Sequence, residues 1–161
     1  MNTRQAGFTL IELIVVIVIL GLLAATALPR YAALQTQARI AKLNGALGAV
    51  KGSAALAHGA CLATSTPVAC TSAGFSLSME GQNVTLINQY PTADAAGIIL
   101  AAGLTITPAE GYATAGGGGA AGDTITVEVL GNTAANCSFT YLAPAAVNTS
   151  PSFGTPIITG C

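Results

Sequence analysis

The sequence predicts an α+β protein in which a long N-terminal α-helix packs on a small antiparallel β-sheet. An apolar run covers residues 8–28, an apolar stripe with helical spacing continues to about residue 58, and period-two alternation marks residues 124–130. The 161 residues allow one domain of ordinary size. Charged residues make up only 7% and the net charge is -1, which argues against a broadly basic, nucleic-acid-binding surface.

The first half of the helix, residues 8–29, is predicted to span a membrane. Its core, residues 8–28, is 21 residues long with one charge, Glu12, and would cover roughly 30 Å, the thickness of a bilayer core. A buried helix of a soluble domain is the alternative, but the run is too long and too uniformly apolar. A secretory signal peptide is another, because Ala24, Ala25 and Ala27 mimic its cleavage site. The apolar pattern continues past them, which disfavours that reading.

Glu12 is the most informative residue of the run. An ionised carboxylate inside a bilayer costs about 2.5–3.5 kcal/mol, and intramembrane acids are usually functional. A tolerated polar residue near the interface is the alternative. The stretch Gly7-Phe8-Thr9-Leu10-Ile11-Glu12-Leu13 resembles the prepilin signature of type IV pilins and of type II secretion pseudopilins.

The resemblance implies a role for each residue of the motif. Residues 1–7 would be a leader that a membrane prepilin peptidase cuts after Gly7, and the new amine of Phe8 would be N-methylated. Glu12 would neutralise the Phe8 amine of a neighbouring subunit. Two opposite charges offset each other's desolvation, which supports this pairing.

The resemblance also implies partners and a location. The chain would form a homopolymer with other pilin subunits, after waiting in the inner membrane with its head in the periplasm. The pilus assembly machinery would then build an extracellular filament for adhesion or motility. One rule disagrees, because three nearby bases (Arg30, Arg39 and Lys42) follow the run and only Arg4 and the starting amine precede it, so the positive-inside rule favours a cytoplasmic C-terminus. The family orientation and the cysteines favour the periplasm, and we follow them.

Residues 30–58 are predicted to continue the helix as an amphipathic stalk. Its apolar positions recur at steps of three and four: Ile40, Leu43, Leu47, Val50, Ala54 and Ala57. We expect Gly45, Gly48 and Gly52 to permit close backbone approach, and His58 to act as the cation at the helix C-terminus. All five bases lie before residue 59 and five of the six acids lie after it, so acidic heads could pack near the basic residues of neighbouring stalks.

Gly21 and Pro29 bracket the weakest part of the predicted helix. Proline removes one intrahelical hydrogen bond and clashes with the preceding turn, so we expect a kink in the membrane-held monomer. The resemblance implies that this stretch could unwind in the filament and make the fibre extensible.

The head is predicted to occupy residues 59–161. Its strongest strand is 124–130, with Ile125, Val127 and Val129 on one face. Residues 137–142 form a second strand, and a short helix runs over 92–102, from Pro91-Thr92 to Gly103. Further strand candidates are 75–79, 84–88 and 156–159.

Cys61, Cys70, Cys137 and Cys161 allow three disulfide connectivities. We favour Cys61–Cys70 and Cys137–Cys161, and the second pair resembles the C-terminal disulfide loop of many type IV pilins. An oxidising periplasm would pair all four. Free buried thiols and a metal site are the alternatives, but the sequence has no CxxC pair and a single histidine.

The sequence offers no convincing catalytic group and predicts no cofactor or metal. It has no nucleophile with a base partner and no carboxylates paired at a useful spacing. Residues 117–122 fit the dinucleotide-binding GxGxxG pattern, but no convincing strand leads into them, so we interpret them as a flexible loop. No base follows Lys51, so nucleic-acid binding by the lateral head surface is not predicted.

Three functions remain open. A structural pilin is favoured over a type II secretion pseudopilin or a minor pilin, because the chain has four cysteines and lacks an acid-rich calcium loop. A signal-anchored binding or enzymatic domain that never polymerises would need neither Glu12 nor the Gly7-Phe8 junction.

Overall fold

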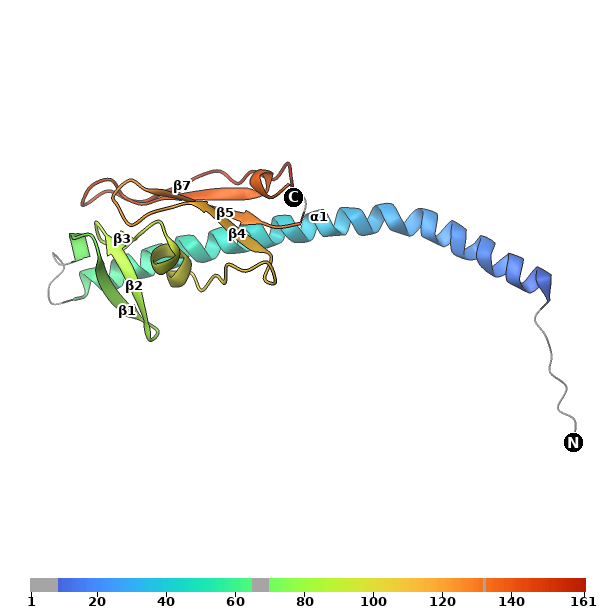
Figure 1. Cartoon of the computed structure of the whole chain (residues 1–161), viewed down its shortest axis with the longest axis horizontal. Helices are drawn as coiled ribbons and strands as arrows, with labels where there is room; N and C mark the ends of the chain where they lie inside the picture. Colours follow the sequence, from blue (N-terminus) through green and yellow to red (C-terminus); the bar gives the residue numbers. More distant parts are fainter. Residues whose placement is uncertain (1–8, 65–69, 132) are drawn as a thin grey trace, which may run out of the picture. The chain divides into compact units, whose positions relative to one another are not determined.

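The computed structural model describes residues 9–64, 70–131 and 133–161 (Figure 1). It divides the chain into an N-terminal unit, residues 1–37, and a head unit, Ala38–Cys161. The helix α1 (Leu10–Leu62) belongs to both. It ends four residues later than the predicted His58, so its last turn reaches Cys61.

The C-terminal part of α1 buries one face in the head unit. The predicted stripe is confirmed, with Ile40 half-buried at its edge. The buried positions of α1 are Leu43, Ala46, Leu47, Val50, Ser53, Ala54, Ala57 and Cys61. The Ser53 hydroxyl donates to the Val50 carbonyl at 3.1 Å, so this polar residue can lie on the buried face.

The glycines of the stalk do not have the expected role within the chain. No atom lies within 4 Å of a Cβ built at Gly45, Gly48 or Gly52, and all three are exposed. The prediction of close backbone approach is therefore wrong for contacts inside this chain, because the glycines face away from the sheets.

A three-stranded antiparallel sheet follows α1, in the order β1-β2-β3. Its strands are β1 (Phe75–Met79), β2 (Gln82–Ile87) and β3 (Tyr90–Pro91). Met79 pairs with Gln82, which leaves Glu80 and Gly81 as a two-residue turn. Val84 and Leu86 pack with Ala57 of α1 and with Cys61 and Cys70.

A four-stranded antiparallel sheet completes the head, in the order β4-β5-β6-β7. Its strands are β4 (Tyr112–Gly116), β5 (Thr124–Val129), β6 (Ser138–Leu142) and β7 (Ser152–Phe153). Ile125, Val127 and Val129 are buried, as the period-two pattern predicts. They share a core with Leu43, Leu47 and Val50 of α1. Figure 1 shows this part of α1 running along the sheets.

One predicted strand is wrong and one predicted helix is shorter than expected. Residues 156–159 form no strand, because only Ile157 bridges to Ser138. The helix expected over 92–102 is present over a shorter range as the π-helix η2 (Ala95–Ile99), which Asp94 caps through its Oδ1, accepting from the Gly97 amide at 2.6 Å. Pro91 belongs to β3 instead. A Cβ at Gly97 would meet Thr92, so close packing on Thr92 distorts the helix.

Side chains tie the two sheets together. The Tyr141 hydroxyl of β6 donates to the Pro91 carbonyl of β3 at 2.7 Å, and the Asn88 amide donates to the Pro144 carbonyl at 2.9 Å. Both side chains are buried. These bonds satisfy polar groups inside the head, as burial requires. A single turn, η3 (Ala134–Asn136), precedes β6.

Candidate assembly site

The N-terminal part of α1 exposes nearly all of its apolar side chains. The large hydrophobic residues from Leu10 to Leu28 are 45% to 75% exposed. Among the described residues, α1 is the one helix long and apolar enough to cross a membrane. An apolar surface of this extent requires a lipid or protein partner, so this segment is the candidate site.

Glu12 caps the helix that carries it. The Thr9 amide and the Thr9 hydroxyl donate to Glu12 Oε2 at 2.9 and 2.8 Å, while the Glu12 amide contacts the Thr9 hydroxyl at 3.3 Å. This reciprocal arrangement is a capping box, which satisfies amides at a helix N-terminus.

The capping role of Thr9 is not among the predictions made from the sequence. Threonine followed three residues later by glutamate is nevertheless the sequence pattern of a capping box. The Glu12 carboxylate therefore has a hydrogen-bond partner within its own chain. Gly7 and Phe8, the predicted processing residues, lie outside the described residues.

The segment from Gly21 to Pro29 is helical in the monomer. Pro29 nevertheless has no amide proton for the carbonyl of Ala25. The Thr26 hydroxyl donates back to the Leu23 carbonyl at 3.0 Å, a bond that competes with the helical ladder. These features weaken α1 locally, which is compatible with the predicted unwinding.

Three cations of the stalk bind their own head. Arg39 Nη1 donates to the Cys161 carbonyl at 2.9 Å. Lys42 Nζ donates to the Glu110 carbonyl and lies 4.3 Å from the centroid of the Tyr112 ring. Lys51 Nζ lies 5.6 Å from the Phe153 ring. We expected basic stalk residues to pack near the heads of neighbouring subunits. Among the described residues, only Arg30 has no contact within its own chain and remains available for this.

His58 is not the terminal cation of α1. The helix continues to Leu62, and its last turn contains no basic residue. The His58 ring stacks on Tyr90, with centroids 4.3 Å apart and planes 2° apart. Its Nδ1 lies 3.3 Å from the Gln89 carbonyl. His58 thus joins α1 to the β2–β3 turn.

Two disulfides close the head, and they are the favoured pairs. Cys61 in the last turn of α1 bonds to Cys70, with a Cα–Cα distance of 6.2 Å. Cys137 bonds to Cys161, with a Cα–Cα distance of 4.8 Å. The second bridge joins the start of β6 to the residue that Arg39 also holds.

No metal or nucleotide site emerges within the described residues. No group of three or more His, Cys, Asp or Glu side chains is placed to hold a metal ion there. Contrary to prediction, a strand, β4, does lead into the glycine-rich residues 117–122, but β5 rather than a helix follows. The loop is also hydrogen-bonded, since Asp123 Oδ2 accepts from the Ala120 amide at 2.8 Å. It is a β-hairpin turn.

The N-terminal segment is similar to segments of known proteins. A family model described as the prokaryotic N-terminal methylation motif matches residues 2–28. The type IV major pilin protein PilE1 of Neisseria gonorrhoeae is 55% identical over 42 residues, which are 26% of this chain and 26% of that protein. No solved structure matches the chain.

Two further relatives extend the likeness along α1. The type IV narrow pilus major component PilA5 of Thermus thermophilus is 48% identical over 54 residues, 34% of this chain and 47% of that protein. The fimbrial protein EcpB of Eikenella corrodens is 48% identical over 58 residues, 35% of this chain and 36% of that protein. The chain thus spans less than half the length of each of these relatives.

Proposed function

We propose that this chain, which carries the N-terminal methylation motif and resembles type IV pilins along α1, is a structural subunit of a bacterial type IV pilus. One observation carries the proposal: an open apolar helix, Leu10–Leu28, contains a single acid at the fifth position after Gly7. Burial against copies of the same helix would remove this surface from water at roughly 25 cal/mol per Å².

The proposed sequence of events starts in the inner membrane. The peptidase cuts between Gly7 and Phe8, and the exposed Phe8 amine becomes methylated. The apolar half of α1 holds the subunit in the bilayer while the disulfide-bonded head faces the periplasm. On assembly, the Glu12 carboxylate takes the Phe8 amine of a neighbouring subunit as its counter-ion, and the polymer is displayed at the cell surface.

The capping box refines this pairing. Thr9 occupies Oε2 of Glu12, so the neighbouring amine would bind the same carboxylate through its second oxygen. A carboxylate accepts several hydrogen bonds at once. The helix start and the subunit contact would thus share one side chain.

The test is to shear filaments from cells that express the full chain and to sequence the N-terminus of the polymer. We expect this protein as the dominant component, beginning with N-methylated Phe8. A different mature N-terminus, or material that remains as single anchored molecules, would overturn the proposal. Recovery only as a trace component of a filament made from another protein would support a minor pilin instead.

A further inference from the structure

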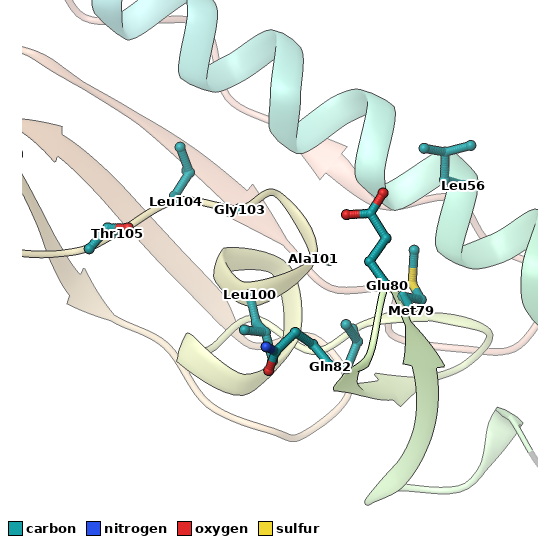
Figure 2. A pocket seen from close by; sticks show the side chains of 10 residues that line it. Leu56, Met79, Glu80, Gln82, Leu100, Ala101, Gly103, Leu104 and Thr105 are labelled. Atoms are coloured by element: carbon teal, nitrogen blue, oxygen red, sulfur yellow. The ribbon is translucent and has the colours of Figure 1, made fainter.

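A cavity of about 500 Å³ opens on the head between α1, the β1–β2 hairpin and the segment after η2. Figure 2 shows Leu56 on the helix, Met79 and Glu80 at the hairpin tip, and Leu100 and Leu104 on the remaining wall. Leu56 is 69% exposed although it is a large apolar residue. Polar and apolar groups contribute about equally to the lining of the cavity, and Glu80 is the one acid among the lining residues.

Glu80 occupies an unfavourable backbone position. It has a φ of 50° and precedes Gly81, with a φ of 79°, in a two-residue hairpin turn of the type that favours asparagine, aspartate or glycine at its first position. Glutamate there is strained. Its exposed carboxylate has no hydrogen-bond partner among the described residues. The fold would thus be better served by asparagine, which points to a use for this carboxylate outside the chain.

Most other charged side chains of the chain already have partners, which limits the groups that could pair with Glu80. Asp94 and Asp123 accept backbone amides inside the head, while Arg39, Lys42 and Lys51 contact it as described above. Among the described residues, Arg30 is the one Lys or Arg side chain for which no partner is found. The carboxylates of Glu80, Glu110 and Glu128 likewise have no hydrogen-bond or ion-pair partner among the described residues, and of these three only Glu80 lines the cavity.

The neighbourhood of Arg30 also matches the cavity. Leu28, Tyr31 and Leu34 are large apolar residues exposed beside it on α1. Arg30 and Leu34 are four residues apart and so lie on one face of the helix. This segment, residues 28–34, presents a cation and an apolar side chain on one face, whereas the cavity presents leucine side chains beside one acid.

We propose that the cavity receives residues 28–34 of a second copy of this chain, with the Arg30 guanidinium bound to the Glu80 carboxylate. The contact rests on the proposed function, because it forms between subunits of the filament. It gives the head a defined place on a neighbouring stalk, whereas burial of the Leu10–Leu28 surface alone is not directional. Arg30 and Glu80 would thereby set the register of the polymer.

Charge exchange tests the pair in cells that express the full chain. We expect Arg30→Glu and Glu80→Lys each to lower the yield of sheared filaments about tenfold, since like charges facing each other across an interface are strongly unfavourable. The double exchange should restore the yield to within about threefold of the native chain. Glu128→Lys makes the same charge change as Glu80→Lys, but at a residue that does not line the cavity. Combining it with Arg30→Glu should not restore the filament yield. Rescue by Glu128→Lys, or no effect of the single exchanges, would overturn the contact.

Cysteine trapping tests the same contact directly. Arg30→Cys and Glu80→Cys are co-expressed on separate copies, with an epitope tag on only one. We expect a mixed, singly tagged dimer after mild oxidation of the filaments, and no such dimer when Glu128→Cys replaces Glu80→Cys. Filaments that form normally but give no mixed dimer would overturn the docking contact alone. Failure of the native chain to form filaments would instead overturn the proposed function.

The variant Glu80→Asn separates assembly from folding. Relief of the strained turn should raise the Tm of the detergent-solubilised chain by about 2–5 °C, while loss of the carboxylate should lower filament yield. A purely structural role for Glu80 predicts the opposite for yield, because a more stable subunit would assemble at least as well. Higher Tm with unchanged yield would therefore contradict the proposal.

Discussion

The two parts of α1 differ in what covers their apolar residues, although both are rich in leucine, valine and alanine. Leu20 is 58% exposed, whereas Leu43 is fully buried. Leu43 has the sheets as its partner, and Leu20 has none among the described residues. Composition alone therefore does not decide burial, and one helix carries both a completed core and a surface that still requires a partner.

The polar contacts of α1 also differ between the head unit and the N-terminal unit. Within the head unit, Arg39, Lys42 and His58 all contact groups of the head. In the N-terminal unit, the capping box between Thr9 and Glu12 is a purely local contact. Folding of the head and assembly through the N-terminal unit should consequently respond to different substitutions.

The largest expected effect is on assembly, at Glu12. Glu12→Ala removes the charge and the cap, whereas Glu12→Gln removes the charge but can keep the cap, because glutamine also serves in a capping box. Both should leave the Tm of the head unchanged and lower filament yield strongly, since an unpaired Phe8 amine in the filament core costs about 3–5 kcal/mol. Sheared-filament yield measures the effect. Normal filaments from Glu12→Gln would show that the cap, not the charge, matters.

A matched pair of leucine substitutions tests the comparison within the helix itself. Leu43→Ala should lower the free energy of unfolding by about 2–5 kcal/mol, because it leaves a cavity between α1 and the sheets. Leu20→Ala should change it by less than about 0.5 kcal/mol, because no core surrounds that side chain in the monomer. Denaturant unfolding of the detergent-solubilised chain, followed by near-UV circular dichroism, measures both. Equal losses would contradict the division of α1 into two regions.

The two disulfides should contribute unequally to the free energy of unfolding of the head. Replacing Cys137 and Cys161 by serine opens a loop with a sequence separation of 24, for which the loop-entropy model gives about 3.5 kcal/mol. Replacing Cys61 and Cys70 opens a loop with a separation of 9 and should cost about 2.5 kcal/mol. Denaturant unfolding of the two variants checks the order. A larger loss from the shorter loop would mean that native-state strain or packing outweighs loop closure.

Sequence patterns predicted the elements whose cause is local. The stripe from Leu43 to Ala57 and the alternation of Ile125, Val127 and Val129 follow directly from helical and strand periodicity. Strands β3 and β7, by contrast, have two residues each. A two-residue strand has no period to detect, and its pairing depends on a neighbour that only the tertiary fold supplies.

Some residues of the candidate sites could be recognised from the sequence, and others only from the tertiary structure. Glu12 was recognisable because a lone acid interrupts an apolar run, and its capping partner Thr9 was recognisable in principle. The strain at Glu80 could not be recognised from the sequence, because the positive φ of this residue follows from the hairpin register that pairs Met79 with Gln82. The apolar stripe predicts that α1 ends near His58 because it stops at Ala57, and no local pattern indicates that the helix continues to Leu62.

A smaller effect is expected where the two sheets meet. Tyr141→Phe leaves the buried Pro91 carbonyl without its donor and should cost about 1–3 kcal/mol. Burial raises the pKa of the Tyr141 hydroxyl in the folded chain, with Tyr90 adding to the shift. The unfolded chain therefore ionises first as pH rises through about 10, so native stability should fall above that pH.

Unfolding free energies measured between pH 8 and 11 check this prediction. The alkaline loss of stability should be smaller in Tyr141→Phe than in the native chain. Tyr31→Phe, which alters an exposed tyrosine of the N-terminal unit, is the control and should leave the profile unchanged. An identical alkaline loss in all three proteins would assign it to other groups.

The smallest expected effect concerns the exposed face of α1 within the head unit. Gly48→Ala should raise the free energy of unfolding by about 0.5–1 kcal/mol, because alanine favours the helix and nothing within 4 Å opposes a Cβ there. Filament yield should stay unchanged, since the proposed contact uses the cavity beside Leu56 and not this glycine. Denaturant unfolding and shearing of the same variant give both values. A more stable head with fewer filaments would show that a neighbouring subunit packs closely on Gly48, and the division between a completed head and an open N-terminal segment would have to move along the helix.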